Sequence, residues 1–161
     1  MKKIKIEIKW AIIFVVMTLI WMFLEKLAGL HDEHIDKHSI YTNFIAIPAI
    51  AIYVFALLDK RKNFYKGAMT YKQGFISGLI ITAIVTVLSP LTQYITSTIT
   101  TPEYFPNMIR YSVETGKMTQ QAAEDYFNLK NYLVEIVIGT PVMGVMTTAI
   151  VAIFTRKKST D

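Results

Sequence analysis

The sequence predicts an all-α membrane protein: a four-helix transmembrane bundle with a helical extracytoplasmic hairpin between the third and fourth spans. Of its 161 residues, 53% are hydrophobic, four long runs contain no charged residue, and Lys and Arg gather on one side of those runs. So apolar a chain cannot close around one small water-soluble core. We therefore expect a single integral membrane domain over residues 1–161.

The charge-free runs cover residues 10–24, 39–58, 73–102 and 136–155. A helix needs about 20 apolar residues to cross the hydrocarbon core of a bilayer. The last three runs are long enough, and the first becomes so if its helix continues to about Leu30 with Lys9 at the opposite interface. We expect spans at about 8–30, 40–58, 74–100 and 133–155. A signal peptide is the alternative for the first run, although no small-residue cleavage site follows it.

The basic residues predict the orientation of these spans. Twelve of the 17 Lys and Arg residues lie in the N-terminal tail, the loop 59–72 and the C-terminal tail. Cytoplasmic loops carry such an excess, so both termini are expected in the cytoplasm. The net charge of +5 is then a topology signal. The lipid bilayer is the expected partner, and nucleic acid is not.

The longer outer loop has its own helix signals, at about residues 103–132. Pro106 suits the first turn of a helix, Gly116 suits its end, and Thr119 suits the cap of a second helix that continues into the last span. This pattern predicts a helical hairpin that lies on the membrane surface.

Small residues recur at intervals of four in two spans. The third span contains Gly74, Gly78 and Thr82, and the fourth contains Gly144 and Thr148. In lipid, helices associate where small residues let their backbones approach closely. We therefore expect these two spans to pack along the stripes. A homodimer through either stripe is the alternative.

All three histidines occur between residues 31 and 38. If this segment is helical, His31, His34 and His38 share one face, and Asp32 supplies a nearby oxygen. Imidazole together with carboxylate suits zinc or a similar divalent cation. This metal site is the only cofactor that the sequence suggests. The sequence favours a satisfied or solvated polar loop between two spans, with no cofactor, and the metal site is the alternative.

Three polar residues lie within or beside the predicted spans: Glu25, Gln93 and Glu135. Ionisable groups at that depth are costly, so the two acids are functional candidates or interfacial residues paired with Lys26. If they lie beside the histidine segment, they can complete a metal shell. Gln93 follows Pro90 in a run of hydroxyl residues, which either satisfy the backbone at a proline kink or line a hydrated crevice.

Catalytic motifs are absent from the sequence. It has no phosphate-binding glycine loop, nucleophile elbow or HExxH zinc motif, and no cysteine. We therefore predict no catalytic residues and no enzymatic activity. A metal-dependent membrane enzyme stays open only through the histidine segment.

Several short motifs resemble the domain-of-unknown-function family 4199, a family of small bacterial membrane proteins with four predicted spans. The motifs are Gly29-Leu30-His31-Asp32, Asp59-Lys60-Arg61, Tyr71-Lys72-Gln73-Gly74-Phe75 and Pro102-Glu103-Tyr104-Phe105. The resemblance covers nearly the whole chain and implies a multi-pass protein of the bacterial cytoplasmic (inner) membrane. It implies no activity, ligand or catalytic residue.

Two functions follow from these observations. The first is a non-enzymatic accessory or scaffolding integral membrane protein of the bacterial cell envelope, which binds a membrane-protein partner or forms a homo-oligomer. The alternative is a binding or transport module for a divalent cation or small solute, which uses the outer histidine-rich loop.

Overall fold

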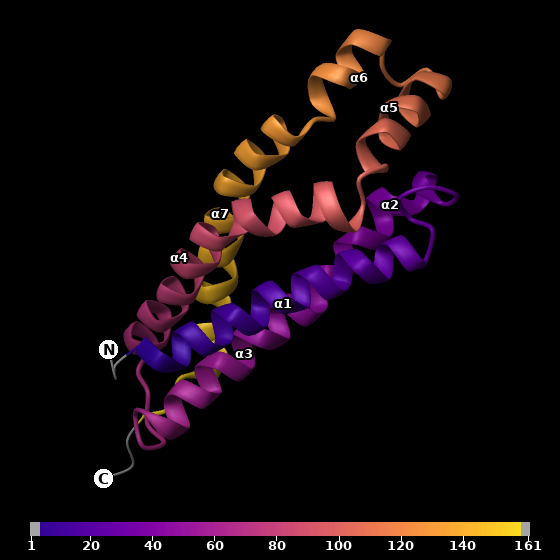
Figure 1. The fold of residues 1–161 in the computed structure, drawn as a ribbon. Helices are drawn as coiled ribbons and strands as arrows, with labels where there is room; N and C mark the ends of the chain where they lie inside the picture. Colours follow the sequence, from indigo (N-terminus) through magenta and orange to yellow (C-terminus); the bar gives the residue numbers. More distant parts are fainter. Residues whose placement is uncertain (1–3, 159–161) are drawn as a thin grey trace.

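The computed structural model describes residues 4–158, and the fold of these residues is all-α. Four helical segments are long and apolar enough to cross a membrane: Lys5–Leu27, Ile35–Asn63, Tyr71–Thr100 and Leu129–Thr155. The predicted fold class and number of spans are therefore confirmed (Figure 1). In chain order the elements are α1 (Lys5–Leu27), α2 (Ile35–Tyr41), the 3-10 turn η2 (Thr42–Ile45), α3 (Ala46–Asn63), α4 (Tyr71–Ile95), the π-helical turn η3 (Thr96–Thr100), α5 (Tyr104–Glu114), α6 (Gln120–Tyr126) and α7 (Leu129–Thr155).

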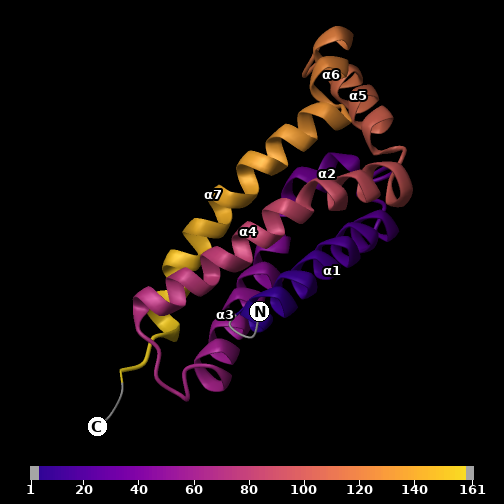
Figure 2. The ribbon, with the colours of Figure 1, turned by 60° about the vertical axis from the view of Figure 1, so that its left-hand side comes forward.

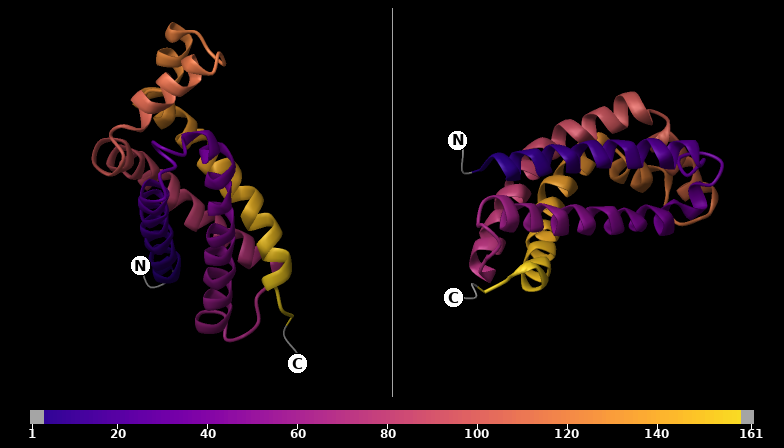
Figure 3. Two further views of the ribbon diagram at one scale, coloured as in Figure 1. Left: turned by 90° about the vertical axis from the view of Figure 1, so that its right-hand side faces the viewer. Right: turned by 90° about the horizontal axis from the view of Figure 1, so that it is seen from below.

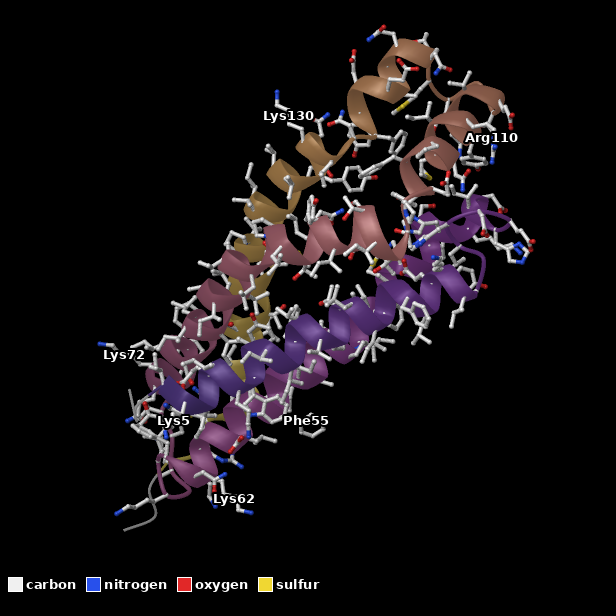
Figure 4. The ribbon with its side chains drawn as sticks, viewed as in Figure 1. Lys5, Phe55, Lys62, Lys72, Arg110 and Lys130 are labelled. Carbon is white, nitrogen blue, oxygen red and sulfur yellow. The ribbon has the colours of Figure 1, made fainter. Side chains whose placement is uncertain are left out.

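The spans alternate in direction, which divides the molecule into two ends. The start of α1, the loop from α3 to α4 and the end of α7 lie at one end, which we call the terminal end (Figure 1). The turn after α1 and the hairpin α5–α6 lie at the other, the hairpin end. Lys5, Lys62 and Lys72 mark the terminal end, and Arg110 and Lys130 mark the hairpin end (Figure 4).

The antiparallel helices α4 and α7 pack most extensively, while α1 packs against α4 and α3, and α3 also packs against α7 (Figures 2 and 3). Their shared core contains small and apolar side chains from all four spans, among them Ala11, Tyr53, Leu57, Ile81 and Ala152. Large apolar side chains face outward instead: Val87 is 77% exposed and Phe154 80%. Such a surface indicates a lipid environment, because in water so much exposed apolar area would drive association.

The small-residue stripes of α4 and α7 face each other within the chain. A Cβ atom added to Gly78 would lie 2.3 Å from Thr148 Cγ2, and one added to Gly144 would lie 2.4 Å from Thr82 Cγ2. One turn towards the terminal end, an added Cβ at Gly74 would lie 3.5 Å from Ala152 Cβ. Each glycine thus receives a side chain from the opposite helix, so the backbones approach closely at these positions.

The hydroxyl groups near Pro90 satisfy the backbone of α4. Proline has no N–H, so the carbonyl of Thr86 loses its usual helical donor. Ser89 Oγ donates to that carbonyl at 2.9 Å, and Thr92 Oγ1 donates to the Leu88 carbonyl at 3.1 Å. The backbone role predicted for these hydroxyls is therefore present at the proline.

The hairpin follows the predicted signals up to its last turn. Gly116 has φ +67° after the end of α5, and Thr119 Oγ1 accepts from the Ala122 N–H at 3.3 Å at the start of α6. The second helix was expected to run on into the last span, and this was wrong. It ends at Tyr126, and Asn128 caps α7 by accepting from the Asn131 N–H at 3.0 Å.

Candidate functional site

A tight turn ends α1 and folds the chain back beside Glu25. Gly29 has φ +73°, a conformation that favours glycine at the end of a helix. The Gly29 N–H donates to the Lys26 carbonyl and the Leu30 N–H donates to the Glu25 carbonyl, both at 3.0 Å. This pair of bonds is a Schellman motif, which explains why the helix stops at Leu27 and not near Leu30 as expected.

The turn and α2 bring two histidines to the Glu25 carboxylate. His31 Nε2 lies 3.1 Å and His38 Nε2 lies 3.4 Å from Glu25 Oε2. One ligand atom from each of these residues lies within 4.8 Å of the others. The Glu25 and His31 side chains are 3% and 4% exposed, and that of His38 is 13% exposed. The site is therefore enclosed and rich in metal-ligating atoms.

Two imidazole nitrogens in this site lack hydrogen bonds. Within residues 4–158, His31 Nδ1 and His38 Nε2 are buried and have no hydrogen-bond partner. A buried polar atom without a partner costs about 1–3 kcal/mol, and native proteins contain few of them. The geometry leaves His38 Nε2 beside a carboxylate oxygen, where a shared cation would satisfy both.

Aromatic and amide side chains hold the three residues in place. Trp21 Nε1 donates to Glu25 Oε1, and the Tyr104 hydroxyl lies 3.4 Å from His38 Nδ1. Burial raises the pKa of Tyr104 above its ordinary value, so the phenol keeps its proton at neutral pH. Asn107 Nδ2 donates to the His31 carbonyl at 2.9 Å, which fixes α5 to the turn.

The structure brings together only part of the predicted metal set. His31 and His38 converge, whereas His34 and Asp32 are exposed and lie outside the cluster. The expected common helical face is wrong, because α2 begins at Ile35 and leaves His31 and His34 in the turn.

Lys26 was expected to pair with a carboxylate, but it donates to a backbone carbonyl instead. Its Nζ donates to the Thr100 carbonyl at 2.6 Å, because neighbouring side chains on a helix point about 100° apart. Lys26 therefore contacts the end of η3, whereas Glu25 contacts the two histidines.

The other two intramembrane polar candidates lie together at a different place. Gln93 of α4 and Glu135 of α7 line a cavity of about 580 Å³ between the four spans. The cavity wall also includes Asn43, Ser89 and Tyr132. Of the two acids proposed to complete a metal shell, Glu25 joins the histidines, and Glu135 faces this cavity.

A second buried polar cluster lies at the terminal end, where the sequence predicted only a basic tail and loop. Lys60 Nζ lies 2.8 Å from Glu7 Oε1, and Ser77 Oγ donates to the same oxygen at 2.6 Å. Glu7 is 1% and Lys60 3% exposed. The signal in the sequence was the spacing of Tyr53, Leu57 and Lys60, which places the lysine on the buried face of α3.

The chain was compared with known families, curated proteins and solved structures. No curated protein and no solved structure shows significant similarity to it. The family model described as "Protein of unknown function (DUF4199)" matches residues 9–157, which is nearly the full length. The chain therefore belongs to the DUF4199 family.

Proposed function

We propose that this membrane protein binds a divalent transition-metal ion at Glu25, His31 and His38 and has no catalytic activity of its own. The observation that carries the proposal is the convergence of three enclosed ligand side chains, in which the His38 Nε2 atom beside the Glu25 carboxylate has no hydrogen-bond partner among the described residues. Solvated loop histidines would instead be exposed and satisfied by water, as His34 is free to be.

The donor atoms favour zinc or a metal with similar preferences. Two imidazoles and one carboxylate suit first-row transition metals, whereas magnesium and calcium prefer oxygen ligands. A zinc ion about 2.0–2.1 Å from two tetrahedral ligands holds those ligands about 3.3 Å apart. The distances from Glu25 Oε2 to His31 Nε2 and His38 Nε2, 3.1 and 3.4 Å, are close to this ligand-to-ligand distance. Trp21 and Tyr104 would then act as outer partners that orient the ligands.

Binding of the metal would link three segments at the hairpin end. Glu25 belongs to α1, His31 to the turn and His38 to α2. Through Tyr104 and Asn107 the same site touches α5. In this proposal the metal fixes the hairpin α5–α6 on the spans.

The melting temperature tests this proposal directly. A ligand that binds only the folded state at 100 times its Kd adds about 2.7 kcal/mol of stability, or about 5–10 °C for a chain of this size. We expect zinc, added after chelator treatment in detergent, to produce such a rise in the natural protein. The rise should be lost in His31→Ala/His38→Ala.

His34→Ala is the matched control, because it removes a histidine of the same turn that lies outside the cluster. We expect this variant to retain the zinc response. Cobalt should give the visible absorption of a four-coordinate site in the natural protein and in His34→Ala only. A zinc response that survives loss of His31 and His38, or no response in the natural protein, would overturn the proposal.

The biological setting that we propose is an accessory or scaffolding role in the bacterial inner membrane. The excess of Lys and Arg at the terminal end favours cytoplasmic termini, which would place the metal site and the hairpin outside. The hairpin is the largest part of the fold beyond the ends of the spans (Figure 1), and Tyr126 on it is 41% exposed.

A photo-crosslinking amino acid at position 126 tests the scaffolding role in native membranes. We expect one discrete adduct, either with a membrane protein or with a second copy of this chain. The same amino acid at Val87 of α4, which is 77% exposed on a span, is the control for random lipid-facing contact. Absence of any discrete adduct specific to position 126 would contradict the role.

A further inference from the structure

The cavity beside Gln93 and Glu135 has features of a ligand site. Its volume of about 580 Å³ lies within the range of about 300–1,000 Å³ that is usual for small-molecule pockets. Its walls come from α1, η2, α3, α4 and α7, mostly in the halves of the spans nearest the hairpin end, and extend past the middle of α7 to Thr147. Most of the lining surface is apolar, and polar side chains from each of these elements interrupt it, a combination that is usual for such pockets.

The charge of the cavity favours a cation. Among the residues that line it, Glu135 is the only one with a charged side chain. The Glu135 side chain is exposed on the protein and lies within a candidate span, so in a bilayer an opposite charge there gains more than it would in water. The Tyr126 side chain faces Glu135 from α6 and is neutral, because burial and the carboxylate raise its pKa. Lys130, at the start of α7, points away from the helices (Figure 4).

The position of the cavity favours a ligand with a large apolar part. Its lining residues Ile50 of α3 and Met143 of α7 are 47% and 60% exposed. Both lie well inside candidate spans, so the cavity meets the molecular surface where the hydrocarbon of a bilayer would be. A ligand that enters there must partition into lipid before it reaches the carboxylate.

From these features we infer that the cavity binds an amphipathic organic cation, with its positive group at Glu135 and its apolar part between α3 and α7. Tyr132, three residues before Glu135 on α7, also lines the cavity and would supply an aromatic ring for the cation. The site shares no ligand residue with the Glu25, His31 and His38 cluster. The cation-binding inference and the metal-binding proposal are therefore independent, and failure of one does not affect the other.

Two ions of nearly equal size and opposite charge provide the test. We would measure binding of tetraphenylphosphonium and of tetraphenylborate by equilibrium dialysis, with the protein in nanodiscs of zwitterionic lipid and with empty nanodiscs as the baseline. We expect saturable binding of the phosphonium only. Glu135→Gln should weaken it by about tenfold or more, whereas the matched variant Glu114→Gln, which removes an exposed acid of α5, should leave it unchanged.

A second variant tests the cavity without touching its charge. Gly139 lines the cavity, and a Cβ added there meets no atom within 4 Å. Gly139→Leu should therefore fold normally and fill the space, so that phosphonium binding falls to the empty-nanodisc baseline. The His31→Ala/His38→Ala variant should still bind. Equal binding of both ions, no saturable phosphonium binding, or binding that survives both Glu135→Gln and Gly139→Leu would overturn the inference.

Discussion

Replacement of Glu7 by alanine is expected to destabilise the protein by about 3–5 kcal/mol. The change leaves the Lys60 ammonium buried without its carboxylate, and it removes the acceptor of Ser77. Lys60 also lies 3.8 Å from the centroid of the Phe64 ring, but a ring face compensates a desolvated charge only in part. Thermal unfolding in a mild detergent, followed by circular dichroism, measures the loss.

Two further variants identify the origin of that loss. In Glu7→Leu/Lys60→Met both charges are gone, so most of the stability should return, because apolar replacement of a buried pair is often neutral or stabilising. Lys9→Ala breaks a pair with Asp59 in which the lysine side chain is 52% exposed, so it should cost at most about 1 kcal/mol. If Glu7→Ala costs no more than Lys9→Ala, the buried pair does not hold α1 to α3 and α4.

The features that the sequence predicts well depend on local pattern. The number of spans follows from the length of charge-free runs, because hydrocarbon thickness sets one scale for all of them. The facing of α4 and α7 follows from the spacing of Gly78, Thr82 and Gly144, because small residues at every fourth position form one face of a helix. Thr119 is a cap that the structure uses as predicted.

The candidate metal site depends on geometry that residue spacing does not give. Glu25 and His31 are six residues apart and would lie on different faces of one helix. They meet because Gly29 reverses the chain, and the same reversal moves His34 away. Gly29, three residues after Lys26, was a signal for the helix end. The direction of the next segment, however, depends on its packing against Tyr104 and Asn107.

The buried pair and the cavity depend on contacts between distant segments. Glu7 and Lys60 are separated by 53 residues, and a charge count places both among solvated loop charges. The cavity depends on how far α3 and α7 separate, which no residue pattern within a single span describes.

Gly144→Ala is expected to destabilise the protein by about 1–3 kcal/mol, because the added methyl would lie 2.4 Å from Thr82 Cγ2 and would force two closely packed helices apart. Gly78→Ala should do the same against Thr148. Gly139→Ala is the matched control on the same helix as Gly144, where the methyl meets no atom within 4 Å. There the better helix propensity of alanine should stabilise the protein by up to about 1 kcal/mol. Melting temperatures of the three variants in detergent measure these opposite signs.

The pairing of the two helices predicts which second substitution restores stability. Thr148→Ala removes the Cγ2 and Oγ1 atoms that a methyl at position 78 would strike, and Thr148 Oγ1 has no hydrogen-bond partner among the described residues. Gly78→Ala/Thr148→Ala should therefore be more stable than the sum of its single variants implies, whereas Gly144→Ala/Thr148→Ala should show no such gain. If the stripes instead formed a homodimer, the losses would depend on protein concentration, because association is then part of the stability. Equal melting temperatures for Gly144→Ala and Gly139→Ala would show that close approach at Gly144 does not stabilise the fold.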